Sequence, residues 1–298
     1  GPNSQGGNQA QLPATTGLQN NTNAFTSTAS VGASSITVTV YAGEVATLPA
    51  ETMSGGVLAN YSVGLSCSGG TLSGTDGKVA NTLAVLPADQ GQPIQCTYTN
   101  TRNSTTLQLQ KTWLNGRAGD TVSLVASGKG TFNSNANGGA SQTDSGPVWT
   151  AYAGEVITID ESFGTITSNP YTPPLGCPNT SGLAWSAADP TEGVLTVGAS
   201  DGPIVCTFTN DRKSTQLYVR KVWGGPVTAA TVSIPATTGF TNNSTAFTST
   251  DPTTTTVGPF QVFAFETGQL PAESFTSGNP GDFTRTVACD GIDGDLGD

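Results

Sequence analysis

Short stretches of alternating apolar and polar residues recur along the chain, and two of them carry a lysine on the apolar side. In LQLQKTW (107–113) both leucines and the tryptophan share one face with Lys111, because strand side chains alternate with a period of two. LYVRKVW (217–223) repeats the pattern and places Lys221 among its apolar residues. The pattern predicts two β-strands that each direct a lysine toward a protein core.

The whole pattern repeats along the chain. CTYTNTR (96–102) returns as CTFTNDR (206–212), and YAGEV begins at both Tyr41 and Tyr152. A unit of this size, made of short alternating segments and Gly/Pro/Asn-rich turns, is typical of a β-sandwich or an open barrel. Five landmark pairs are each separated by 110 positions: Cys67 and Cys177, Cys96 and Cys206, Asn100 and Asn210, Lys111 and Lys221, and Trp113 and Trp223.

The repeats predict an all-β chain of tandem β-sandwich domains in a linear array. Repeat 1 covers residues 1–105 and lacks a first strand like LQLQKTW. Repeat 2 covers 106–215 and is complete, and repeat 3 covers 216–298 and stops before its C-terminal strands. The links between repeats are only a few residues long, which favours a stiff string of domains.

The cysteines follow the same spacing. Cys67 and Cys96 lie 29 positions apart, and so do Cys177 and Cys206. Equal spacing in two copies predicts an intradomain disulfide in each, and therefore an oxidising compartment such as a cell surface. Cys289 has no partner in this sequence, and the simplest interpretation is that its partner belongs to the missing part of repeat 3.

Composition narrows the function. The chain of 298 residues has a formal net charge of −11, only 10% charged residues and no basic cluster, which argues against a nucleic-acid partner. No apolar run is long enough to span a membrane. The absence of histidine excludes Ser-His-Asp and Cys-His catalysis and the commonest zinc ligand, so we expect neither a metal nor a cofactor.

Two further polar groups fall on inward faces. Asn210 shares a face with Cys206 in CTFTN, Asn100 holds the same position in repeat 1, and Glu161 shares a face with the isoleucines of VITIDES. Burial lowers the pKa of a lysine and raises that of a glutamate, so Lys111 becomes a neutral nucleophile while a protonated Glu161 can donate to the asparagine carbonyl. Attack of the amine on the amide would release ammonia and leave an isopeptide bond, with proximity in the core supplying the rate.

These residues resemble a known family. LQLQKTW, GEVITIDES and CTFTN, in this order, are similar to the prealbumin-like CnaB/SpaA domains of bacterial surface adhesins and pilus shafts. GEVATLPAET (43–52) is the matching glutamate strand of repeat 1. The resemblance implies a prealbumin- or Ig-like sandwich in which Lys111 of the first strand is joined to Asn210 of the last strand with help from a glutamate. The paired cysteines depart from the usual family pattern.

Two sets of glutamates recur along the chain, so each repeat offers two candidates for the residue that promotes the isopeptide bond. Glu51, Glu161 and Glu273 each precede a cysteine by 16 positions, whereas the spacing of Glu44, Glu155 and Glu266 varies. A reacting residue should keep its register in the fold, so Glu161 is the predicted promoter of the bond, and Glu51 and Glu273 are its counterparts. Glu155 remains the alternative, because both candidates have the same strand parity.

Other interpretations of the same residues stay open. Lys111 could end a strand with its amine reaching water, Asn210 could cap a turn, and a disulfide could staple the domain alone. Asn100 and Lys221 have no partners within their own repeats, either because the segment is cut from a longer array or because strands are donated between molecules.

The sequence predicts a structural stalk or fibre segment of a bacterial surface protein, with extracellular location and with neighbouring repeats or identical subunits as partners. The alternative is an adhesin module that binds a host surface receptor or a glycan, for which the polar loops NNTNAFTST and NNSTAFTST are candidates. A turnover enzyme is not expected: isopeptide formation is a single-turnover self-modification.

Overall fold

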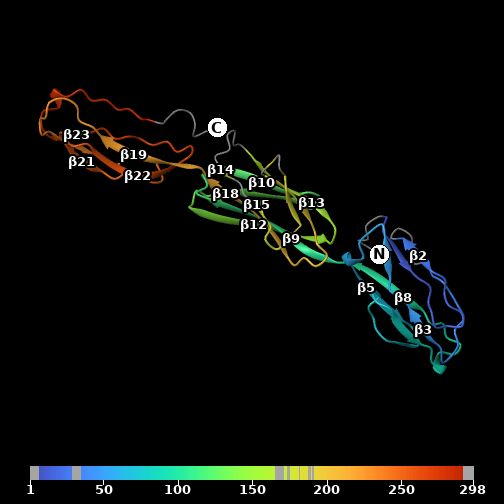
Figure 1. Cartoon of the computed structure of the whole chain (residues 1–298). Helices are drawn as coiled ribbons and strands as arrows, with labels where there is room; N and C mark the ends of the chain where they lie inside the picture. The colour runs from blue at the N-terminus through green and yellow to red at the C-terminus, as the bar shows by residue number, and fades with distance from the viewer. Residues whose placement is uncertain are drawn as a thin grey trace.

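The chain folds into β-rich lobes that follow one another in a row (Figure 1). The computed structural model describes residues 7–28, 35–164, 171–172, 175–180, 182–186, 189 and 191–290. Among these residues the helical elements are three short 3₁₀ turns: η1 (Leu58–Asn60), η2 (Pro87–Asp89) and η3 (Pro280–Asp282). The protein is therefore all-β, as the alternation predicts.

The middle lobe, formed by repeat 2, is built from two sheets. One sheet has the strand order β12-β9-β18-β14, with β15 also paired to β18, and the other has the order β11-β10-β13-β17-β16. The strands are β9 (Ser104–Leu114), β10 (Thr121–Ala126), β11 (Gly130–Asn135), β12 (Ser141–Tyr152), β13 (Val156–Phe163), β14 (Tyr171–Thr172), β15 (Leu175–Gly176), β16 (Leu183–Trp185), β17 (Glu192–Thr196) and β18 (Ile204–Arg212).

The first and last strands of this lobe are neighbours. β9 and β18 run parallel, with Phe208 opposite Lys111 and Asn210 opposite Trp113. Every second residue of β9 from Leu107 to Trp113 is buried, so the period-two pattern of the sequence is the pattern of the core face. The parallel pairing places the lysine and the asparagine on adjacent strands.

Apolar side chains of both sheets fill the space between them. Leu107, Leu109 and Trp113 of β9 belong to one cluster with Ile157 and Ile159 of β13. All five side chains are at most 1% exposed. Polar groups that enter this space lose their contact with water, which sets the chemistry of the site below.

Repeat 1 is formed by three smaller sheets with the strand orders β2-β1-β4, β3-β7-β6 and β5-β8. Its own cluster is centred on Ala46, Leu48, Leu65 and Leu83. The strands are β1 (Gln9–Leu12), β2 (Phe25–Thr28), β3 (Val45–Leu48), β4 (Thr52–Ser54), β5 (Tyr61–Cys67), β6 (Thr71–Leu72), β7 (Asn81–Ala84) and β8 (Cys96–Arg102).

Repeat 3 has the two sheets β19-β22 and β21-β20-β23. Its strands are β19 (Ser214–Lys221), β20 (Thr231–Ile234), β21 (Phe247–Thr250), β22 (Thr255–Phe263) and β23 (Ser274–Ser277). β19 resembles β9 in sequence, and alternate residues of β9 are buried. In β19 the residues are only half-buried or exposed. The described part of repeat 3 therefore covers β19 less well than repeat 2 covers β9.

The lobes are joined by almost continuous strands. A single residue, Asn103, separates β8 from β9, and a single residue, Lys213, separates β18 from β19. The last strand of one repeat thus leads directly into the first strand of the next.

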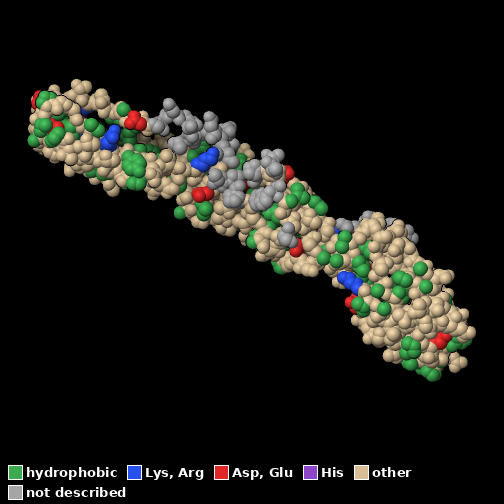
Figure 2. Space-filling model, viewed as in Figure 1, with side chains coloured by type: hydrophobic (Ala, Val, Ile, Leu, Met, Phe, Trp, Pro, Cys, Tyr) green, Lys and Arg blue, Asp and Glu red, His purple; other side chains and the backbone are tan. Residues whose placement is uncertain are grey.

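The visible surface carries scattered charges among uncharged polar side chains and backbone (Figure 2). In the described part of the chain, no helix has the length and apolar character needed to cross a membrane.

Candidate functional site: a buried lysine, glutamate and asparagine

Lys111 points into the core of repeat 2. It lies on β9 between the buried residues Leu109 and Trp113, and its side chain is 0% exposed. Its Nζ lies 2.6 Å from Oε1 of Glu161 and 4.8 Å from the centre of the Trp113 ring. The alternative in which the amine reaches water is wrong, because the whole side chain is covered.

Glu161 reaches the lysine from the opposite sheet. It lies on β13, opposite Leu124 of β10, and it is 2% exposed. Its Oε1 accepts a hydrogen bond of 3.0 Å from Nδ2 of Asn210 in addition to its contact with Lys111. One carboxylate oxygen therefore contacts both groups that would form the bond.

Asn210 completes the constellation from the last strand. It is 0% exposed, inside β18 and opposite Trp113 of β9, so it does not cap a turn. In the structure, Nδ2 of Asn210 donates to Oε1 of Glu161, which is the arrangement of an ionised carboxylate. The donation from Glu161 to the carbonyl of Asn210, predicted from the sequence, requires the protonated form.

Two polar atoms at this site have no hydrogen-bond partner among the described residues. They are Oε2 of Glu161 and Oδ1 of Asn210, whereas Nζ of Lys111 is held by its ion pair with Oε1 of Glu161. A buried polar atom without a partner costs roughly 1–3 kcal/mol, and more when it is charged. The site is therefore unfavourable as three separate groups, and joining two of them removes part of that cost.

Burial moves both titrating groups toward their neutral forms. Desolvation lowers the pKa of Lys111 to about 8, against the opposing attraction of Glu161. Desolvation also raises the pKa of Glu161, although Lys111 and the hydrogen bond from Asn210 act in the other direction. A neutral amine beside a protonated carboxyl is the protonation state that nucleophilic attack requires.

Glu155 has a different place. Its Oε2 accepts a hydrogen bond of 2.9 Å from the backbone N–H of Tyr152 and lies 2.7 Å from Nζ of Lys129. It closes a turn between β12 and β13, whereas Glu161 occupies the core. The structure brings Glu161 to Lys111 and Asn210, and leaves Glu155 outside that group.

Repeat 1 contains two of the three groups. Nδ2 of Asn100 donates a hydrogen bond of 2.6 Å to Oε1 of Glu51, and burial raises the pKa of Glu51 against this hydrogen bond. Oδ1 of Asn100 has no partner among the described residues, as in Asn210. Lys78, the lysine of this repeat, lies in a turn beside Asp76.

Repeat 3 contains the lysine and the glutamate of the site. Nζ of Lys221 lies 2.8 Å from Oε2 of Glu273 and 4.6 Å from the centre of the Trp223 ring. The pair is more open than in repeat 2, with side-chain exposures of 17% and 16%. Repeat 2 thus has the lysine, the glutamate and the asparagine together. Repeat 1 has the asparagine and the glutamate, and repeat 3 has the lysine and the glutamate.

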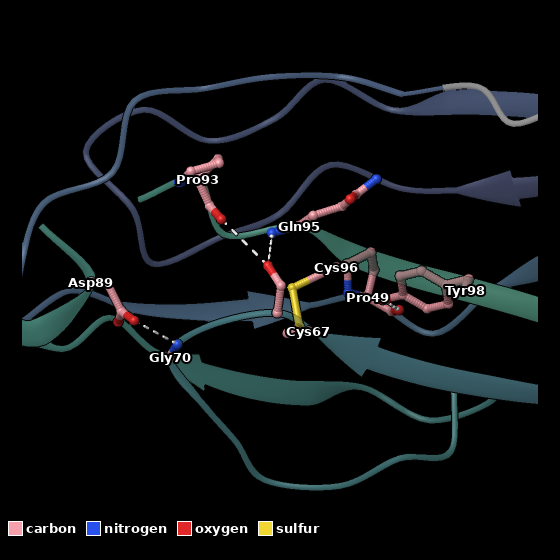
Figure 3. Close-up of a disulfide and its surroundings, with 9 residues drawn as sticks. Pro49, Cys67, Gly70, Asp89, Pro93, Gln95, Cys96 and Tyr98 are labelled. Atoms are coloured by element: carbon pink, nitrogen blue, oxygen red, sulfur yellow. Dashed lines mark hydrogen bonds between the residues drawn. A yellow bond between two sulfur atoms is a disulfide. The ribbon is translucent and has the colours of Figure 1, made fainter. Parts of the chain in front are cut away.

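Disulfides join the cysteines that the spacing pairs: Cys67 with Cys96, and Cys177 with Cys206. Figure 3 shows the first of them, close to Tyr98, whose hydroxyl donates a hydrogen bond of 2.7 Å to the carbonyl oxygen of Pro49. Cys289 is exposed and unpaired. Each disulfide fastens the last strand of its repeat to an earlier segment, on the strand that also carries the asparagine.

Sequence reasoning missed two residues at the junctions between repeats. The side chain of Arg102 reaches repeat 2, and that of Arg212 reaches repeat 3. Both arginines stand at the same position of CTYTNTR and CTFTNDR, two residues after the asparagine. The repetition of this arginine was the signal that could have identified them.

Comparison with known proteins gives structural neighbours only. No family model and no curated protein matches the chain. A Mobiluncus mulieris adhesin described as containing intramolecular disulfide, isopeptide and ester bond cross-links matches with a TM-score of 0.28 and 12% identity, over 71% of this chain and 87% of that chain. The C-terminal fragment of the pilus adhesin SpaC from Lactobacillus rhamnosus GG matches with a TM-score of 0.29 and 12% identity, over 69% and 89%.

These two neighbours are described as a bacterial adhesin and a pilus adhesin. A TM-score below 0.3 carries no argument about function by itself. The function is therefore argued from the side chains of this chain.

Proposed function

We propose that this chain is a stalk segment of a bacterial cell-surface adhesin or filament, in which repeat 2 is fastened by an isopeptide bond between Lys111 and Asn210. The observation that carries the proposal is the contact of one buried oxygen of Glu161 with both of these side chains. The two disulfides support an oxidising, extracellular location. Neighbouring repeats or identical subunits are the proposed partners.

The chemistry follows from the protonation states. Neutral Nζ of Lys111 attacks Cγ of Asn210, the Cγ–Nδ2 bond breaks, and the new Nζ–Cγ amide forms. The proton lost from Nζ leaves with Nδ2 as ammonia, and Glu161 carries it between the two nitrogens. The reaction needs no oxidant, metal or cofactor, and it occurs once per molecule.

The position of the bond suits a load-bearing role. Tension enters repeat 2 along β9 and leaves along β18, because these are its first and last strands. A covalent bond between Lys111 and Asn210 passes the force directly from one strand to the other. The segment between the two residues is then protected from extension.

The intact mass of the reduced, denatured chain tests the bond. We expect one ammonia less than the sequence mass for the native chain, and the full mass for the variants Lys111→Arg, Asn210→Ala and Glu161→Gln. Glu155→Gln is the matched control and should retain the loss, because Glu155 lies outside the site. A native chain with the full sequence mass would refute the cross-link.

The two incomplete sites support a finer proposal, that strands are donated between molecules. In the described residues, β8 is paired only with β5, whereas its counterpart β18 also pairs with β9. The open edge of β8 lies along the strand that holds Asn100, whose Oδ1 is buried without a partner. A parallel strand that carries a lysine could occupy this edge, and Lys221 of another molecule is the candidate.

Covalent multimers on a reducing, denaturing gel test this finer proposal. We expect a ladder from the concentrated chain that disappears in Asn100→Ala and in Lys221→Arg. Asn210→Ala, which alters only the complete site, should leave the ladder intact. A chain that remains monomeric at high concentration would exclude strand donation and leave the stalk proposal untouched.

A further inference from the structure

At each junction between repeats an arginine of one repeat binds a backbone carbonyl of the next. At the first junction, Nε and Nη2 of Arg102 donate hydrogen bonds of 2.9 and 2.7 Å to the carbonyl oxygen of Ala153. The guanidinium lies 5.5 Å from the centre of the Tyr152 ring. A forked hydrogen bond together with an aromatic contact is a geometry that arginine can make and lysine cannot.

The second junction has a related contact with one hydrogen bond in place of the fork, because Nε of Arg212 has no partner among the described residues. Nη2 of Arg212 donates to the carbonyl oxygen of Ala264, and its guanidinium lies 5.8 Å from the ring centre of Phe263. Arg212 is 8% exposed, so the contact is buried. Two arginines at equivalent positions thus bind two equivalent aromatic–alanine pairs.

The backbone completes the contact in the other direction. The N–H of Ala153 donates to the carbonyl oxygen of Asn103, and the N–H of Ala264 donates to that of Lys213, both at 2.9 Å. The arginine and the residue after it therefore bind both the N–H and the C=O of one alanine. An isolated arginine cannot make this contact, because the carbonyl that accepts from the alanine N–H belongs to the residue after the arginine.

The aromatic–alanine turn has the same construction in all three repeats. A glutamate closes it by accepting from the backbone N–H of the aromatic residue, three positions earlier. The three hydrogen bonds are Tyr41 to Glu44 at 2.7 Å, Tyr152 to Glu155 at 2.9 Å, and Phe263 to Glu266 at 3.0 Å. This role explains why the glutamates outside the isopeptide site recur.

In repeat 1 the turn is formed, and no arginine among the described residues binds it. Ala153 and Ala264 are each 1% exposed under their arginines, whereas Tyr41 is 50% exposed and Ala42 is exposed as well. Among the described residues, no hydrogen bond involves the N–H or the C=O of Ala42. Both arginines of the CTYTNTR and CTFTNDR segments are already engaged at the other two turns.

We propose that residues 41–44 are a docking seat for the arginine-bearing end of the last strand of another repeat of this kind. The arginine binds the carbonyl oxygen of Ala42 and stacks on Tyr41, and the carbonyl oxygen of the next residue accepts from the N–H of Ala42. The inference rests on the proposed serial stalk but not on the isopeptide bond. It identifies the chemistry by which one repeat recognises the next.

Amide chemical shifts of the full isotope-labelled chain test the seat. The probe is a synthetic peptide of residues 207–214 (TFTNDRKS), added to millimolar concentration. We expect shifts at Ala42 and Gly43, with affinity at least about tenfold weaker when Arg212 of the peptide is replaced by Ala, since a hydrogen bond from a charged donor is lost. A peptide with lysine at that position keeps the charge and should also bind more weakly.

The chain provides its own controls. The amides of Ala153 and Ala264 should not respond to the peptide in the native chain, because their seats are filled by the strand ends of the same chain. Shifts confined to β8 would show edge addition instead and overturn the seat, as would equal binding of the Arg212→Ala peptide or no response at Ala42. Each of these results is independent of the mass test, so failure of the seat and failure of the cross-link are distinguishable.

Discussion

At the scale of single residues, the reaction depends on how many protons the pair of Lys111 and Glu161 holds. With two protons the amine is an ammonium and cannot attack, and with none Glu161 cannot protonate the departing nitrogen. The reactive state carries one proton, and it exists between the raised pKa of Glu161 and the pKa of about 8 of Lys111. Proton transfer within the pair converts the ion pair into the neutral amine and acid.

The rate of bond formation should therefore pass through a maximum and fall above about pH 8. The measurement is the intact mass as a function of time after unreacted, denatured chain is diluted into native buffers of different pH. A rate that continues to rise well above the pKa of Lys111 would show that the free amine suffices and that Glu161 has no role as an acid. Glu155→Gln should leave the profile unchanged.

At the scale of elements, the disulfide and the proposed isopeptide bond both act on β18. The disulfide joins Cys206 of this strand to Cys177, just after β15, over a sequence separation of 29. Closing such a loop stabilises a domain by about 3–4 kcal/mol in the chain-entropy estimate. The double variant Cys177→Ser/Cys206→Ser should lose about this much unfolding free energy.

Urea unfolding followed by tryptophan fluorescence measures this loss, because Trp113 and Trp149 both pack in the core of repeat 2. The control is Cys67→Ser/Cys96→Ser, which should destabilise repeat 1 and leave the transition of repeat 2 in place. An unchanged midpoint for the Cys177/Cys206 variant would mean that the disulfide contributes nothing beyond the packing. Isopeptide formation should persist in both variants, since neither disulfide supplies a group to it.

The strands of repeat 2 also show which features of the fold and the site could be predicted from the sequence. The alternation in LQLQKTW identified β9 and its buried lysine, and the inward Glu161 and Asn210 followed from the same parity. Parity could not separate Glu161 from Glu155, because their positions differ by an even number and only the long-range fold places one in the core and the other in a turn. The orientation of the Asn210 amide and the partners of Arg102 and Arg212 likewise depend on contacts between distant segments.

At the scale of the whole molecule, the lobes lie in a row and successive strands connect them (Figure 1). A pulling force along this row loads β9 and β18 of repeat 2 before any other strand of that lobe. With the isopeptide bond in place, the 98 residues between Lys111 and Asn210 cannot be extended. Without it, they would add roughly 330 Å at the ~3.3–3.6 Å per residue of an extended chain.

Single-molecule stretching under reducing conditions distinguishes these cases. The native chain should show no unfolding step of that length for repeat 2, whereas Glu161→Gln should show it, because the strands then separate once their hydrogen bonds break. Glu155→Gln should behave as the native chain does, since it leaves the site intact. An unfolding step of full length in the native chain would mean that tension is carried by packing and hydrogen bonds alone, and the protein could not serve as the covalently fastened stalk proposed here.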